Sequence, residues 1–114
     1  MFFNLTNHTI RIVLEGERTI EIHPSGTVAR LACTQRSAGE INGVPVVETI
    51  FGGPMGLPEP VSGVVYVTST LVAQEAARRG RTDVYSPDTS QGSAVFNESG
   101  SLWGVCRLQT FRIA

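Results

Sequence analysis

Segment 69–80, STLVAQEAARRG, carries the one clear helical pattern in a chain made otherwise of short strand-like runs. Its apolar residues recur at the three- and four-residue spacing of one helix face: Val72, Ala73, Ala76 and Ala77. Ser69 or Thr70 can cap the first turn, and Gly80 suits the position just after a helix. The pattern predicts a helix over about residues 69–79. We expect this single helix to pack on a sheet.

Alternating apolar residues predict strands before and after this helix. Segments 10–14 and 19–23 alternate with a period of two, and segment 64–69, VVYVTS, is apolar on both faces, which is typical of a central strand. Asn42-Gly43 is a strong hairpin signal, and the turn NESG at 97–100 predicts a C-terminal hairpin with a long last strand. We therefore predict one α+β domain over 1–114: a mainly antiparallel sheet with one helix packed on it.

Other predictions follow from the loops and the cysteines. The glycine- and proline-rich segment 52–63 favours an irregular crossing loop. Cys33 and Cys106 each lie in an apolar run, which favours two buried free thiols of a cytoplasmic protein over the alternative, a disulfide between neighbouring strands. Phe96 and Trp103 lie in predicted strands. Aromatic residues in strands are more often buried in the core than stacked on a ligand, so we expect both in the core.

Charge and composition exclude several functions. Nine basic and ten acidic residues give a net charge of −1, which argues against binding to nucleic-acid polymers. No run approaches the length of a membrane span, so we expect no membrane contact. His8 and His23 lack neighbours at ligand spacing, and FGGPMG is no phosphate loop, so we expect no metal and no cofactor. A modest core makes a homo-oligomer an expected source of further burial.

Two places in the sequence could bind a ligand. A helix that begins at Ser69 and Thr70 offers free backbone N–H groups and the positive end of the helix dipole to an anion. The simpler interpretation is that these hydroxyls only cap the helix. We favour it because most Ser and Thr residues at helix starts do only that.

The second place is GRTDVYSPD at 80–88. Arg81 and Asp83 can form an ion pair that braces the loop, which is the simpler interpretation. The functional interpretation is that the arginines bind an anionic group, the tyrosine stacks on a ring and a carboxylate accepts from ribose hydroxyls. The residues in question are Arg78, Arg81, Asp83, Tyr85 and Asp88.

Motifs spread over nearly the whole chain resemble those of a family of small, mostly uncharacterised proteins of bacteria and bacteriophages. The family pattern contains Asn-Leu-Thr-x-His-x-Ile, Leu-Pro-x-Pro, Ser-x-Leu-Val-Ala, Gly-Arg-x-Asp and Pro-Asp. The matching residues here begin at Asn4, Leu57, Ser69, Gly80 and Pro87. Many relatives have Arg-Asp before the last turn, where this chain has Phe96-Asn97. The resemblance implies no established activity, but it implies a phage or bacterial setting.

The function that we expect is non-enzymatic binding of a small anionic, nucleotide-like ligand by a homo-oligomer in the bacterial cytoplasm. Phages encode small sequestering proteins for the nucleotide signals of bacterial immunity, and this chain is similar to them in size. Asn4, Thr6 and His8 would complete the site from another strand or subunit. The alternatives are a protein–protein accessory factor and, third, a small hydrolase that uses His8 and a carboxylate.

Overall fold

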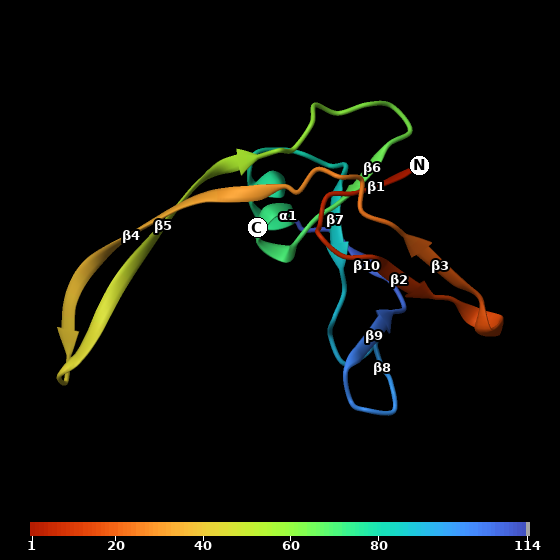
Figure 1. Cartoon of the computed structure of the whole chain (residues 1–114). Coiled ribbons are helices and arrows are strands. Elements are labelled where there is room, and N and C mark those ends of the chain that lie inside the picture. Colours follow the sequence, from red (N-terminus) through yellow and green to blue (C-terminus); the bar gives the residue numbers. More distant parts are fainter. Residues whose placement is uncertain (114) are drawn as a thin grey trace.

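The computed structural model, which describes residues 1–113, has the α+β class that the sequence predicts (Figure 1). A first sheet has the strand order β1-β6-β7-β10 and a second the order β3-β2-β9-β8. The first consists of β1 (Phe2–Asn4), β6 (Val65–Val67), β7 (Val84–Pro87) and β10 (Leu108–Gln109). The second consists of β2 (Ile10–Val13), β3 (Thr19–Ile22), β8 (Ala94–Phe96) and β9 (Leu102–Val105). A short 3₁₀ turn, Glu15–Glu17, joins β2 to β3.

Strand β6 is central, as its apolar sequence predicts. It pairs in parallel with β1 on one side and with β7 on the other. Because successive side chains of a strand point to opposite faces, Tyr66 and Val67 enter different cores. Tyr66 packs with the helix-side cluster, and Val67 packs with Ile10, Ile12 and other residues of the second sheet. The first sheet is thus covered on both faces.

The single helix, α1 (Thr70–Arg78), confirms the prediction for 69–79. The Ser69 hydroxyl accepts a hydrogen bond from the Val72 N–H at 3.4 Å, and Gly80 has φ +87°, the left-handed conformation expected after a helix. Val72, Ala73 and Ala76 are buried on the helix side of the first sheet. The helix connects the parallel strands β6 and β7, which need such a crossover.

Both predicted hairpins form. The turn at Asn42-Gly43 has φ +52° and +82°, the two positive values of a type I′ turn, and it joins β4 (Arg30–Ile41) to β5 (Val44–Met55). This two-stranded hairpin, which we call the arm, projects away from the rest of the protein (Figure 1). The NESG turn joins β8 to β9 and is closed by the Asn97 side-chain oxygen, which accepts from the Ser99 and Ser101 N–H groups.

Several local predictions are wrong. Cys33 and Cys106 are both exposed, because Cys33 lies on the projecting arm and Cys106 follows the end of β9. The expected long last strand breaks at Cys106, whose N–H donates to Ser93, and β10 then joins the other sheet. The first residues of 52–63 continue strand β5 rather than forming a loop.

The exposed aromatics are a further difference. Phe96 is 62% exposed and Trp103 is 39% exposed, so the prediction that both are core residues is wrong. Trp103 lies instead on the surface under the Arg11 guanidinium, which is 4.4 Å from the ring centroid. Such a cation–π contact uses the aromatic face without burying it.

Asn4 joins β1 to the loop that follows it. Its amide nitrogen donates to the carbonyl oxygens of His8 and Ile22, each at 2.8 Å. Its amide oxygen accepts from the Thr6 N–H at 2.9 Å and lies 2.6 Å from the Thr6 hydroxyl. The side chain is 1% exposed, so every polar atom of the amide is satisfied inside the protein.

We expect Asn4→Ala to lower the free energy of unfolding by about 2–4 kcal/mol, because it leaves several buried polar groups without partners. Urea denaturation measures the change. Asn7→Ala is the matched control, since Asn7 is exposed and should alter stability by less than about 0.5 kcal/mol. Equal effects of the two substitutions would contradict the role given to Asn4.

Candidate functional site

A depression of about 430 Å³ lies at the N-terminal end of α1. It is enclosed by the loop after β1, the start of α1, the base of the arm and the end of β7. These four segments are far apart in the sequence. The volume lies within the range of small-molecule sites, which is about 300–1,000 Å³. We call this depression the pocket.

Four of the predicted site residues line the pocket: Thr6, His8, Ser69 and Thr70. Their positions depend on the Asn4 network. The His8 carbonyl oxygen accepts from Asn4, and the Thr6 hydroxyl lies 3.0 Å from the same oxygen, so the loop backbone is fixed. The His8 side chain remains exposed, with its Nδ1 atom 3.2 Å from the Asn7 side-chain oxygen. The network therefore holds the loop and leaves the imidazole free for a ligand.

The start of α1 provides the electrostatics of the pocket. The Val72 N–H donates to the Ser69 hydroxyl and the Ala73 N–H donates to the Ser69 carbonyl oxygen. Within residues 1–113, the N–H groups of Thr70 and Leu71 donate to no other group. Unpaired N–H groups at the positive end of the helix dipole favour an anion. Capping and ligand binding are compatible here, because the cap uses only the third N–H.

Among the lining residues that sequence reasoning missed are Arg30 and Phe51, both from the base of the arm. Arg30 is exposed and forms no ion pair with any residue in 1–113. Phe51 is 49% exposed. No local motif marks either residue, since only the packing of the arm base on the helix side brings them to α1.

Arg81 and Asp83 form a closed pair away from the pocket. The Arg81 Nε donates to Asp83 Oδ1 at 2.8 Å, and Nη2 donates to Asp83 Oδ2 and to the Pro58 carbonyl oxygen, each at 3.0 Å. The guanidinium also lies 6.0 Å from the Tyr66 ring centroid. The hydrogen bond from Arg81 lowers the pKa of Asp83, and the same bond raises the pKa of Arg81. This geometry is that of a loop brace.

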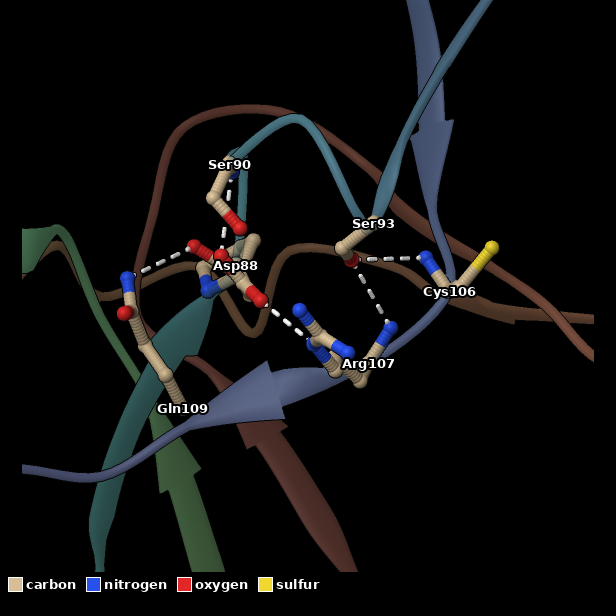
Figure 2. A network of polar contacts seen from close by, with 7 residues as sticks. Asp88, Ser90, Ser93, Cys106, Arg107 and Gln109 are labelled. Carbon is tan, nitrogen blue, oxygen red and sulfur yellow. Dashed lines mark hydrogen bonds and ion pairs between the residues drawn. The ribbon is translucent and has the colours of Figure 1, made fainter.

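Asp88 belongs to a second polar network, which joins β7 to the C-terminal strands (Figure 2). Arg107 Nε donates to Asp88 Oδ2 at 2.6 Å, and the Ser90 N–H donates to Oδ1 at 3.0 Å. The Ser93 hydroxyl accepts from the N–H groups of Cys106 and Arg107. The hydrogen bond from Arg107, followed by those from Ser90, lowers the pKa of Asp88 to about 2. The network holds the turn after β7 against the break between β9 and β10.

The ten predicted site residues therefore do not converge on one place. Arg78 is exposed and pairs with Glu75 at 3.2 Å near the C-terminal end of α1, and Tyr85 is half-buried in β7. Neither lines the pocket. Asn4 does not line the pocket, but its side chain donates to the His8 carbonyl oxygen and so holds the loop that does. A ligand role for Arg78, Arg81, Asp83, Tyr85 and Asp88 stays a prediction, and their observed contacts are structural.

Residues 1–113 contain no group of three or more His, Cys, Asp or Glu side chains placed to hold a metal ion. Over the same range, no helix is long and apolar enough to cross a membrane. The sixteen residues that line the pocket include Arg30 and His8 but no Asp, Glu or Cys. The lining of the pocket thus combines polar and apolar residues and contains no acidic group.

Comparison of the chain with protein-family models, with curated proteins and with solved structures finds no match. Function therefore has to be argued from the pocket itself.

We expect Arg81→Ala to lower the free energy of unfolding by about 1–2 kcal/mol, because it removes a bidentate, largely buried ion pair and leaves Asp83 unpaired. A double-mutant cycle with Asp83→Ala in urea denaturation measures the coupling, which we expect to be about 1 kcal/mol. Additive effects within about 0.3 kcal/mol would contradict the brace.

Acid should weaken the Asp88 network. Because the folded-state pKa of Asp88 is about 2 and its usual pKa is about 3.9, the contribution is fully present above pH of about 4 and is lost as the pH falls toward 2. Arg107→Gln should raise the Asp88 pKa toward its usual value, as read from the carboxyl carbon shift in an NMR titration. An unchanged Asp88 pKa in this variant would show that Arg107 is not the cause.

Proposed function

We propose that this protein binds a small anionic, nucleotide-like ligand in the pocket and does not transform it. The observation that carries the proposal is the chemistry of the lining: positive groups and hydroxyls at a helix N-terminus, apolar surface beside them, and no carboxylate. A phosphate group would bind to the positive groups and hydroxyls, and a base or a sugar face would pack against the apolar surface.

The parts of such a ligand have distinct places in the pocket. A phosphate would lie at the start of α1, where it could accept from the N–H groups of Thr70 and Leu71 and from the hydroxyls of Ser69 and Thr70. Arg30 would supply the counter-charge, as a planar fork that matches phosphate oxygens. A planar base would pack against Phe51.

The lining disfavours the hydrolase alternative. His8 is the one lining residue with a side chain suited to general base catalysis, and neither Asp83 nor Asp88 lies in the pocket to orient it. A base without an orienting partner and without an activated nucleophile beside it is a poor catalytic set. Simple binding needs neither group.

The biological setting that we propose follows the family resemblance: a phage or bacterial protein in the cytoplasm that sequesters a nucleotide signal. The match in motifs and size supports this setting, and the pocket supports the ligand class. A protein–protein accessory role is the competing proposal, and it becomes the preferred one if no ligand is found.

Binding can be tested by thermal shift with cyclic dinucleotides, linear and cyclic ADP-ribose and NAD, each recovered and checked for integrity. A ligand at one hundred times its Kd should stabilise the protein by about 2.7 kcal/mol. Arg30→Ala should weaken the binding of that ligand at least tenfold in calorimetry, because it removes the charge opposite the phosphate.

Arg78→Ala is the matched control, because Arg78 is also an exposed arginine but lies near the other end of α1. It should leave the affinity within about twofold. Failure of every ligand in the panel to raise the melting temperature would sink the proposal. Recovery of degraded ligand would favour the hydrolase instead.

A further inference from the structure

The lining of the pocket carries one strong binding group for a phosphate and one for a base. Among the described residues that line it, Arg30 is the one permanently charged side chain, and Phe51 is the one with a phenyl or indole ring. A guanidinium fork matches the oxygens of one phosphate group, and one phenyl face stacks on one base. The two residues therefore provide for a single phosphate and a single base.

The volume of the pocket agrees with a ligand of this size. Its 430 Å³ lies in the lower part of the range of about 300–1,000 Å³ for sites that enclose most of a small ligand. One nucleotide is a ligand of that kind, whereas a second nucleotide doubles the number of atoms to be enclosed. A ligand of two nucleotides would therefore have to extend beyond the pocket.

A smaller depression borders the pocket, since His8 and Pro87 line both. We call it the side groove. Its other lining residues include Arg11, Trp103 and the end of β9. The volume of the side groove is about 100 Å³, which is well below the range of about 300–1,000 Å³ for small-molecule sites. A ligand that extended past His8 would enter a space too small to enclose a base with its sugar.

The binding groups of the side groove are already in use. The Arg11 guanidinium lies 4.4 Å from the ring centroid of Trp103, so it covers one face of the indole. Its Nη1 atom donates to the Trp103 carbonyl oxygen at 2.9 Å, and Nη2 lies 3.5 Å from a carboxylate oxygen of Glu21. A covered ring face cannot stack on a base, and a nearby carboxylate repels a phosphate. Arg30, by contrast, pairs with no acidic group in the described chain.

We infer that the ligand of the pocket is a mononucleotide, with one base, one sugar and one phosphate group, an assignment that rests on the proposed function. The phosphate lies between Arg30 and the start of α1, and the base stacks on Phe51. A linear ligand with two nucleotides binds through one of them and leaves the other in solvent. The solvated half adds little affinity, because it exchanges no contacts with water for contacts with protein.

Calorimetry with matched pairs of ligands tests this assignment. The mononucleotides are AMP, GMP, CMP and UMP, and their partners are the 5′-phosphorylated dinucleotides pApA, pGpG, pCpC and pUpU. Each pair has the same base and the same 5′-phosphate and differs by a second nucleotide. At least one mononucleotide should bind with a Kd in the micromolar range, and the Kd of its dinucleotide should agree within about threefold.

Phe51→Ala should weaken the binding of that mononucleotide by at least about fivefold, because stacking of a base on an aromatic ring is lost. Phe96→Ala is the matched control, since Phe96 is also an exposed phenylalanine and lines neither the pocket nor the side groove. It should leave the affinity within about twofold. Circular dichroism should show both variants folded.

Fluorescence locates the second nucleotide independently, because Trp103 is the one tryptophan of the chain and lines the side groove. Its emission maximum should be the same with a bound dinucleotide as with the bound mononucleotide. A different maximum, or a dinucleotide that binds more than about tenfold tighter than its mononucleotide, would place the second nucleotide on the protein and overturn the assignment.

Equal weakening by Phe51→Ala and Phe96→Ala, or no weakening by either, would also overturn it. So would the failure of all four mononucleotides to bind. In that case the proposed function still stands if a ligand of the thermal-shift panel binds, and it falls as well if none does. The two failures are therefore distinguishable.

Discussion

The burial of β6 on both faces is the constraint on which the rest of the structure depends. Tyr66 and Val67 point to opposite sides of a short strand, and each side must be closed by a different layer. The helix closes the side of Tyr66, and the second sheet closes the side of Val67. Because β6 leads directly into α1, the same constraint fixes the helix N-terminus at the end of the sheet, where the pocket forms.

The charged residues that attract attention in the sequence serve mostly to hold this arrangement together. Arg81 with Asp83 braces the segment between α1 and β7, and Asp88 with Arg107 ties the end of β7 to the C-terminal strands. Residue type alone does not separate a brace from a ligand site, since both use arginine, carboxylates and hydroxyls. A brace is distinguished from a ligand site by the contacts that each side chain makes in the folded protein. A guanidinium whose N–H groups already donate to protein atoms has fewer donors left for a ligand.

The arm gives the protein two different surfaces. Its base contributes Arg30 and Phe51 to the pocket, and further out it exposes apolar residues on both faces, among them Val44 and Val47.

The sequence by itself determined the local elements: the helix over 69–79, the turn at Asn42-Gly43, the central β6 and the α+β class. These depend on periodicity, capping and turn chemistry, which act within a few residues. It also indicated Thr6, His8, Ser69 and Thr70, which do meet. Only the tertiary structure decided the exposure of Cys33, the parallel pairing around β6, the projection of the arm and the arrival of Arg30 at the helix. Each of these depends on contacts between segments distant in the chain, and local preference carries no information about them.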